Sequence, residues 1–429
     1  MDYKETEVGR IPTYWNVYQL SDIGEIVGGG TPKTKVDEYW NGDIPWITPK
    51  DLSGFTDRYI YSGERNITKI GLDKSSAKLL PKNTVLFSSR APIGYVAIAG
   101  NELTTNQGFK SIICNENNAY PLFIYYLLKS KKESIENIAG GSTFKEISGK
   151  AMKEFKVQVP PISEQRAIAK ILSALDEKIE TNNRINEKLE EMAQALFKHW
   201  FVDFEFPNEN GEPYKSSGGE MMDSELGMIP KGWEITQLGE LIDVIDNRGK
   251  TPPLSKDKTN FPIIDVKALS GTERIINYDN CTKFVDKTTY DSWFRSGHPK
   301  TGDILLSTVG SIGELKIFYG DIGCIAQNVV ALRVKNLSYL YLYQYLQHIK
   351  GELISYNIGS VQPSIKITHV KNHEILVPQK DIEGLFNKNI NKLSLLIFNN
   401  SSENKKLSLI RETLLPKLMS GEIRVSLDE

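Results

Sequence analysis

The chain has 429 residues, of which 40% are hydrophobic and 25% charged, values of an ordinary globular protein of about two to three domains. Its formal net charge of −2 argues against a wholly basic nucleic-acid binder, but a basic face balanced by acid elsewhere is compatible with it. Cys114, Cys281 and Cys324 are too widely separated for a disulfide framework or a zinc site, which fits a reducing cytosol. The apolar runs are too short to span a membrane and the N-terminus is no signal peptide, so we expect a cytoplasmic protein without membrane contact.

The first part of the chain is predicted to be a mainly antiparallel β domain. Short apolar runs, such as Val85–Ser89 and Tyr95–Gly100, alternate with Gly, Pro, Asn and Asp, which favour turns. A short helix is expected at residues 121–131, before the last strand. The run Gly28–Pro32 is rich in glycine but lacks the spacing of a dinucleotide fingerprint, so a tight turn is the better interpretation.

A long helix is predicted from Ser163 to Trp200, a stretch without Gly or Pro. Ser163 is a plausible N-cap after Pro160 and Pro161. Steps of four and three residues give a heptad seam that is apolar except for two central asparagines. The seam consists of Ile168, Leu172, Leu175, Ile179, Asn182, Asn186, Leu189, Ala193, Leu196 and Trp200. A helix about 50 Å long with one apolar stripe needs a partner.

After an expected exposed linker, Phe206–Glu220, the chain repeats itself. Glu7–Trp15 (EVGRIPTYW) resembles Glu225–Trp233 (ELGMIPKGW), shifted by 218 positions. Further matches join Thr31-Pro32 with Thr251-Pro252, Asp43–Gly54 with Asn260–Gly271, Val85–Gly94 with Ile304–Gly313, Gln107 with Gln327, and Gly141-Ser142 with Gly359-Ser360. Such self-similarity predicts two copies of one structural unit, each a globular part followed by a long helix.

The same shift carries the seam onto a second long helix near the C-terminus. Its positions are Phe386, Ile390, Leu393, Ile397, Asn400, Asn404, Leu407, Arg411, Leu414 and Leu418, and both asparagines recur. Asp381 is expected to cap this helix, and Pro416 to kink or end it. Two unrelated amphipathic helices could share a period, but chance rarely also matches a polar pair.

We expect the two helices to pair antiparallel, with Asn182 facing Asn404 and Asn186 facing Asn400. A polar residue in an apolar seam fixes the register of the pair. Two similar globular parts related by a pseudo-two-fold axis would then present similar surfaces. Such an arrangement suits duplex DNA, which repeats every ~34–36 Å.

The chain resembles the specificity subunit of type I restriction–modification systems. The resemblance is carried by Val159–Phe204, by Leu407–Val425, and by GGTPKT and IPWITPKDL in the first globular part. It implies an α+β fold in which two similar, mainly β target-recognition domains are separated by two long antiparallel helices that form a coiled-coil spacer. The implied domains are 1–160 (first target recognition), 161–205 (central spacer helix), 206–222 (linker), 223–378 (second target recognition) and 379–429 (distal spacer helix and tail).

The resemblance also implies function and partners. Each target-recognition domain would read one half of a bipartite site in double-stranded DNA, and the helix pair would set the spacing and dock methyltransferase subunits. Two methyltransferase subunits and two restriction/translocase subunits would assemble around one such chain. The chain itself is expected to be non-catalytic and to hold no cofactor or metal, since S-adenosylmethionine, ATP and Mg belong to the partner subunits.

The two repeats differ where they are expected to contact bases. Arg90 corresponds to Val309, and Phe144 falls near Gln362-Pro363. This fits two domains that read different half-sites.

Phosphates favour Lys, Arg, Ser and Thr, and base edges favour Arg, Asn and Gln, so we select such residues in predicted loops as DNA contacts. In the first domain they are Lys33, Lys35, Lys50, Arg58, Arg90, Asn106, Gln107, Ser142, Thr143 and Lys145. In the second they are Arg248, Lys250, Lys267, Thr308, Ser311, Gln327, Asn328, Ser360, Gln362 and Lys366. Each could instead be a solvated surface residue or make a turn hydrogen bond.

Two alternatives stay open at this point. The chain could be a stand-alone enzyme, either a fused methyltransferase or a nuclease that uses Asp303, Glu314 and Lys316. These three residues mimic a metal-dependent nuclease core, although a solvent-facing hairpin is the better interpretation. The chain could also be a coiled-coil interaction protein without nucleic acid. No P-loop is visible, and His369 and His373 lack a third zinc ligand.

Overall fold

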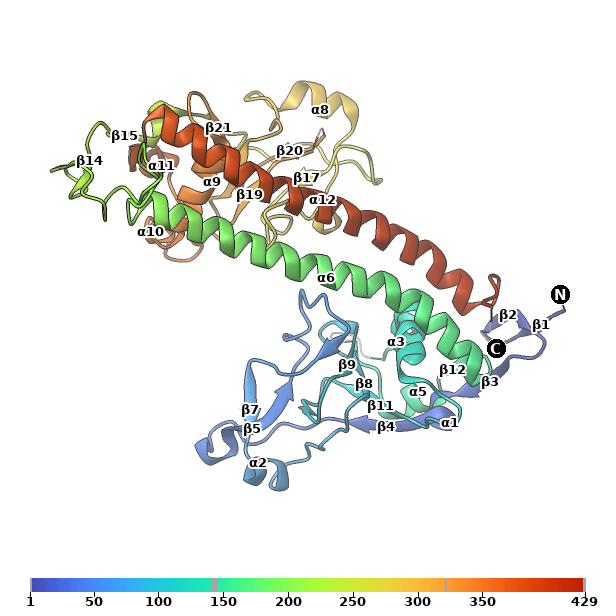
Figure 1. Ribbon diagram of the computed structural model, residues 1–429. Helices are drawn as coiled ribbons and strands as arrows, with labels where there is room; N and C mark the ends of the chain where they lie inside the picture. The colour runs from blue at the N-terminus through green and yellow to red at the C-terminus, as the bar shows by residue number, and fades with distance from the viewer. Residues whose placement is uncertain (1, 141–144, 321, 427–429) are drawn as a thin grey trace. The chain divides into compact units, whose positions relative to one another are not determined.

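The computed structural model describes residues 2–140, 145–320 and 322–426 (Figure 1). The chain forms two compact units, one of residues 1–181 with 403–429 and the other of residues 182–402. We call them unit 1 and unit 2. The division passes through both long helices, α6 (Ile162–Phe201) and α12 (Lys380–Met419), so each unit contains a segment of each helix. Within the described residues, no helix is long and apolar enough to cross a membrane.

Both long helices lie where the heptad pattern of the sequence predicted them, and every position of the seam is buried or half-buried. The predicted caps are wrong. Ser163 and Asp381 are each the second residue of their helix, and the helices begin directly after Pro161 and Gln379. Pro416 does not end α12, which continues to Met419. Pro416 has no N–H to donate to the carbonyl of Glu412, so the helix continues past it with one backbone hydrogen bond fewer.

Within each unit, the two helices run antiparallel. In unit 1, Asp176 of α6 accepts a hydrogen bond of 2.6 Å from Arg411 of α12. In unit 2, the amide of Asn400 donates to Asn186 Oδ1 at 2.9 Å, and Asn186 Nδ2 donates to Ser401 Oγ at 3.2 Å. The predicted Asn186–Asn400 pair is therefore confirmed. Asn182 and Asn404 are both buried.

Unit 1 is built on a five-stranded sheet in the order β4-β11-β8-β9-β6. Its strands are β4 (Gly24–Gly28), β11 (Lys110–Cys114), β8 (Val85–Ser89), β9 (Ile93–Ala99) and β6 (Tyr59–Ile60). The β6–β9 pair is parallel and the other pairs are antiparallel. A second sheet has the order β10 (Thr104–Thr105), β5 (Trp40–Ile47) and β7 (Arg65–Ile67). Two small pairs are β1 (Tyr3–Thr6) with β2 (Gly9–Pro12), and β3 (Asn16–Gln19) with β12 (Lys156–Val159). The short helices are α1 (Leu20–Ile23), α2 (Lys69–Asp73), α3 (Pro121–Ser130), α4 (Lys132–Asn137) and α5 (Gly149–Glu154).

Unit 2 repeats this order with β16-β21-β18-β19. Its strands are β16 (Ile242–Ile245), β21 (Val329–Val334), β18 (Ile304–Ser307) and β19 (Leu315–Ile317). Three small pairs are β17 (Ile263–Ile264) with β20 (Cys324–Ile325), β15 (Glu234–Gln237) with β22 (Glu374–Val377), and β13 (Met221–Met222) with β14 (Ile229–Pro230). The short helices are α7 (Leu238–Leu241), α8 (Lys287–Trp293), α9 (Tyr339–His348), α10 (Lys350–Ser355) and α11 (Ile367–Asn372). The internal repeat expected from the sequence is therefore present in the fold.

Equivalent side chains in the first turns of the long helices hold the repeats' short helices. Gln165 Oε1 accepts from the backbone N–H of Tyr120, directly before α3, at 2.8 Å. Glu383 Oε1 accepts from Ser338, directly before α9, at 2.6 Å. Each repeat thus packs a buried, apolar short helix against its long-helix segments. Phe206, the first residue of the expected linker Phe206–Glu220, is buried and stacks on Tyr214 and Trp233. The start of this segment is therefore packed within unit 2 and is not an exposed linker.

The asparagine contact in unit 2 gives a stability prediction. Replacing Asn400→Ala leaves the buried Asn186 Oδ1 without that donor, and we expect a loss of about 1–3 kcal/mol of unfolding free energy. The control Asn399→Ala removes an exposed neighbour, and its effect should stay within about 0.5 kcal/mol. Urea denaturation followed by circular dichroism measures both. Equal losses in the two variants would contradict a register role for Asn400.

Candidate nucleic-acid interface

Several loops of unit 1 converge at one end of its sheets. Thr31 Oγ1 is hydrogen-bonded to the side chain of Gln107, and the backbone N–H of Gly30 donates to Thr105 at 2.9 Å. The backbone N–H of Ser89 donates to Gly108 at 2.7 Å. We call residues 29–35, 89–92, 105–108 and 145–147 the loop cluster of unit 1.

The glycine run has a packing role in this cluster. A Cβ atom on Gly29 would lie 2.1 Å from the carbonyl oxygen of Asn106, and one on Gly30 would lie 2.4 Å from the backbone of Ala77. Only glycine permits so close a backbone approach. Gly29 and Gly30 are thus explained by the close packing of neighbouring loops. The tight turn expected from the sequence is wrong, because Gly28 ends β4 and residues 29–33 form no turn.

Arg90 stands at the end of β8, and its charge is shared with the next loop. Its Nη1 lies 3.6 Å from Glu146 Oε2, and Lys110 Nζ lies 3.6 Å from Glu146 Oε1. The backbone of Ser89 accepts from Ile147 at 3.0 Å, which fixes the two loops together. The Arg90 side chain is 36% exposed, so it can exchange Glu146 for an anion from outside.

Unit 2 has an equivalent loop cluster, formed by residues 246–252, 308–311, 326–328 and 363–366. Gln327 Nε2 donates to Thr251 Oγ1 at 2.5 Å, as the Gln107–Thr31 pair predicts. The Thr308 backbone donates to Asn328 at 2.8 Å and accepts from Ile365 at 2.9 Å, which reproduces the two contacts of Ser89. The scaffold of the cluster is therefore the same in both repeats.

The side chains carried by this common scaffold differ. Val309 occupies the place of Arg90 and pairs through its backbone with Ser364. Unit 2 instead places Arg248 in the cluster, where its Nε and Nη2 contact both carboxylate oxygens of Asp246 at 2.5–3.0 Å. Burial raises the pKa of Asp246, but the hydrogen bonds and charge of Arg248 outweigh it and hold this pKa below its ordinary value. Asp246 therefore stays ionised and holds Arg248 in place.

Most of the residues selected from the sequence lie in or beside these clusters. In unit 1 they are Lys33, Lys35, Arg90, Asn106, Gln107 and Lys145, with Lys50 in the exposed turn after β5. In unit 2 they are Arg248, Lys250, Ser311, Gln327, Asn328, Ser360, Gln362 and Lys366, with Lys267 in the equivalent turn after β17. Ser142 and Thr143 lie outside the described residues. Thr308 is buried, so the cluster uses its backbone.

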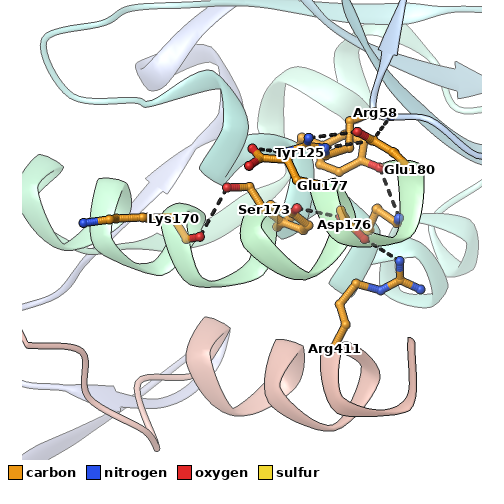
Figure 2. A network of polar contacts seen from close by, with 10 residues as sticks. Arg58, Tyr125, Lys170, Ser173, Asp176, Glu177, Glu180 and Arg411 are labelled. Carbon is orange, nitrogen blue, oxygen red and sulfur yellow. Dashed lines mark hydrogen bonds and ion pairs between the residues drawn. The ribbon is translucent and has the colours of Figure 1, made fainter. Parts of the chain in front are cut away.

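Arg58 lies elsewhere, and its placement does not support the predicted DNA contact. Its side chain is 5% exposed and forms a bidentate ion pair with Glu180 of α6 (Figure 2). Figure 2 also shows Arg411 of α12 turned towards Asp176. In unit 2, Arg274 is buried in the same manner and bonds to Glu190 of α6 and Ser394 of α12. The sequence around Arg58 gives no sign that its side chain is buried, because its partner Glu180 lies 122 positions away.

Sequence reasoning also missed Lys110 and Glu146. Lys110 is the first residue of β11 and its side chain is 14% exposed. The residues that follow it in this strand, Ser111–Cys114, have the mainly apolar sequence typical of a buried strand. A lysine in an apolar strand indicates an unusual environment, but its partner Glu146 could be found only from the fold.

The nuclease-like residues have separate partners. Asp303 is paired with Arg333 at 2.7 Å, and Glu314 lies 3.2 Å from Lys350. Lys316 Nζ donates to the carbonyls of Gly271 and Glu273. The expected hairpin is present, since β18 pairs antiparallel with β19, but the expectation that it faces solvent is wrong, because both strands are buried throughout. Among the described residues, no group of three or more His, Cys, Asp or Glu side chains is placed to hold a metal ion.

The chain matches known proteins over nearly its whole length. The family described as "Type I restriction modification DNA specificity domain" matches residues 12–191 and 230–408, once for each repeat. The type I restriction enzyme MjaIX specificity subunit of Methanocaldococcus jannaschii is 37% identical over 432 residues, which cover 99% of this chain and 97% of that protein. The HindI specificity subunit of Haemophilus influenzae is 24% identical over 481 residues, 95% of this chain and 99% of that one.

A solved structure has a similar fold. The crystal structure of a type I restriction–modification S subunit from M. genitalium aligns with a TM-score of 0.53 and 18% identity, covering 97% of each chain. This likeness supports the two-repeat architecture with two long helices.

The buried Lys316 predicts a pH dependence of stability. Burial lowers its pKa to about 8, against the opposing pull of Glu273 and Glu314. In the unfolded chain a lysine titrates near ~10.4. Between these values Lys316 binds more protons in the unfolded chain, so its contribution to stability should rise with pH from about 8 towards about 10.4. Buried tyrosines such as Tyr126 and Tyr343, whose pKa burial raises, act in the opposite direction, in wild type and variant alike. Urea denaturation of both proteins at pH 7 and pH 10 isolates this contribution, and the stability of wild type relative to Lys316→Met should increase between the two pH values. Parallel pH profiles for wild type and variant would contradict the assignment.

Proposed function

Because the chain belongs to the type I restriction–modification DNA specificity family, we propose that each of its repeats reads one half of a bipartite DNA site for a type I complex. The single observation that carries this proposal is the pair of loop clusters. Their scaffold contacts are equivalent, in the side-chain pairs Thr31–Gln107 and Thr251–Gln327 and in the backbone hydrogen bonds of Ser89 and Thr308. Exposed side chains such as Arg90 have no counterpart in the other repeat. A common scaffold with different exposed side chains suits two readers of different sequence.

The chemistry of the clusters supports contact with DNA. Exposed lysines such as Lys33, Lys35 and Lys250 suit phosphates, which position a protein on the duplex. Arg90, Asn106 and Gln327 are residue types that bind base edges, Arg with guanine and Asn or Gln with adenine. Arg90 is held loosely, at 3.6 Å from Glu146, so a DNA contact costs it little.

The helix pair has a different role in this proposal. α6 and α12 fix the position of each repeat and thereby the spacing of the two half-sites. They also offer the surface on which methyltransferase subunits dock, two per chain, and two restriction/translocase subunits complete the assembly. Methylation with S-adenosylmethionine, and cleavage with ATP and Mg, belong to those partners. The chain contributes sequence recognition and assembly, without chemistry of its own.

An exchange of Arg90 tests this division of labour. We expect Arg90→Ala, assembled with the methyltransferase subunits, to relax or abolish base preference in one half-site, because a good base contact contributes about 1–3 kcal/mol of discrimination. The other half-site should keep its sequence. The measurement is sequencing of methylated sites in DNA from cells that carry the complex.

The matched control is Lys69→Ala, an exposed residue of the same repeat paired with Asp73 and distant from the cluster in sequence. It should leave both half-sites unchanged. Equal loss at both half-sites in Arg90→Ala would count against independent reading by the two repeats.

A further inference from the structure

We propose that Arg58 and Arg274 are equivalent positioning residues that lock the central hairpin of each repeat to the long helices, and that they thereby set the one spacing at which the two half-sites are read. The central hairpins are β8–β9, which carries Arg90, and β18–β19, which carries Thr308–Ser311. This inference rests on the proposed function and assigns to two arginines a part in it that needs no contact with DNA.

In unit 1 the lock is made of one arginine and one carboxylate. Arg58 donates from Nε and from its backbone N–H to Glu180 Oε1, each at 2.9 Å, and from Nη2 to Glu180 Oε2 at 2.9 Å. The side chain of Glu180 is 12% exposed. Burial lowers the pKa of Arg58, but the hydrogen bond and charge of Glu180 outweigh it and raise this pKa, so the pair is ionic. Because both carboxylate oxygens of Glu180 accept from the planar guanidinium, this bidentate ion pair, which we call the fork, fixes the orientation of the Arg58 side chain as well as its distance from α6.

In unit 2 the arginine reaches both long helices. Arg274 Nε donates to Glu190 Oε2 of α6 at 2.8 Å, and Nη1 donates to Ser394 Oγ of α12 at 2.6 Å. Its side chain is 1% exposed, and that of Glu190 is 17% exposed. Gln344 of α9 donates to the other oxygen of Glu190 at 3.2 Å, so the short helix is tied into the same contact.

The two arginines occupy the same place in the fold. The carbonyl of Arg58 accepts from Ile98 of β9 at 2.8 Å, and the carbonyl of Arg274 accepts from Ile317 of β19 at 2.7 Å. In both repeats the residues that follow run parallel to that strand, Tyr59 beside Ile98 and Ile275 beside Ile317. The arginine is therefore kept in both repeats although its partners on the helices differ.

The backbone carbonyl of each arginine bonds to the strand that leads directly from the loop cluster, so the arginine links this strand to the long helix. β9 begins at Ile93, directly after the loop that holds Arg90, and β19 follows the loop that holds Ser311. The strand bonded to the arginine is thus the return strand of the central hairpin. A rotation of the repeat on its helix would have to break this buried ion pair.

A buried ion pair is a poor source of net stability, because both charges lose their hydration. Its geometry is what distinguishes it from an apolar contact of the same size. The neighbouring Glu177, 63% exposed and 3.3 Å from Arg58, lacks this geometry and serves as a built-in comparison. Glu180, and not Glu177, should therefore carry the positioning effect.

The experiment uses the full chain assembled with its methyltransferase subunits. After the wild-type motif is known, its half-sites are placed in DNA with the native spacer and with spacers one base pair shorter and longer. We expect Glu180→Gln to raise methylation at the altered spacers relative to the native one by about tenfold over wild type. The bases preferred within each half-site should not change. Glu177→Gln should behave as wild type.

Unit 2 offers an independent arm. Glu190→Gln should loosen the spacing as Glu180→Gln does, and Glu191→Gln, an exposed neighbour paired with Lys188, should not. If Glu180→Gln fails to assemble, Arg58→Lys retains the charge without the fork and should show the same loosened spacing. An assembled Glu180→Gln or Arg58→Lys complex that keeps wild-type spacing overturns the inference for Arg58.

Two further results are decisive. A changed base preference with unchanged spacing in Arg58→Lys would make Arg58 a DNA-contacting residue and overturn the inference. A wild-type complex that methylates no bipartite motif would contradict the proposed function itself. The two failures are therefore distinguishable, since the second is visible before any variant is made.

Discussion

The antiparallel contact of α6 with α12, present within each unit, is the constraint on which the rest of the structure depends. The seam is apolar along most of its length, so burial supplies its free energy, and polar contacts set its register. In unit 2 the polar contact is Asn186 with Asn400 and Ser401, and in unit 1 it is Asp176 with Arg411. A shift by one turn would separate these partners inside a buried interface, where an unpaired polar group is costly. The helices therefore present Glu180 and Glu190 at defined places to the repeats that they hold.

Each repeat is held to its long-helix segments by side chains at equivalent positions, although the partners of these side chains differ. Gln165 and Glu383 hold α3 and α9, and Arg58 and Arg274 hold the central hairpins. The loop clusters continue this pattern, with equivalent Gln–Thr contacts below unlike exposed residues. In the proposed function, equivalent attachment with unlike loop residues permits the two repeats to differ in sequence specificity without loss of the scaffold.

The periodic features could be predicted from the sequence. The seam, the repeat and the antiparallel asparagine pair all follow from the spacing of residues along the chain. The helix starts were missed, since Ser163 and Asp381 offered capping side chains but Pro161 and Gln379 directly precede the first helical turn. Arg58 was misjudged for a different reason. An arginine in a predicted loop suggests a phosphate contact, and its burial is decided by Glu180, far away in sequence. Lys110 with Glu146, and Arg274 with Ser394, are likewise products of tertiary structure that no local pattern announces.

The direction of the helix pair in unit 1 is open to one direct measurement. From the Asp176–Arg411 contact, six residues towards the start of α6 lead to Lys170, and six towards the end of α12 lead to Lys417. Spin labels are attached to cysteines that replace Lys170 and Lys417 in one sample, and Lys170 and Lys405 in another. Pulsed electron paramagnetic resonance then gives the distance between the two labels in each sample. Antiparallel helices predict that the Lys170–Lys417 distance is the shorter of the two. A shorter Lys170–Lys405 distance would contradict the pairing and, with it, the account of how the repeats are held.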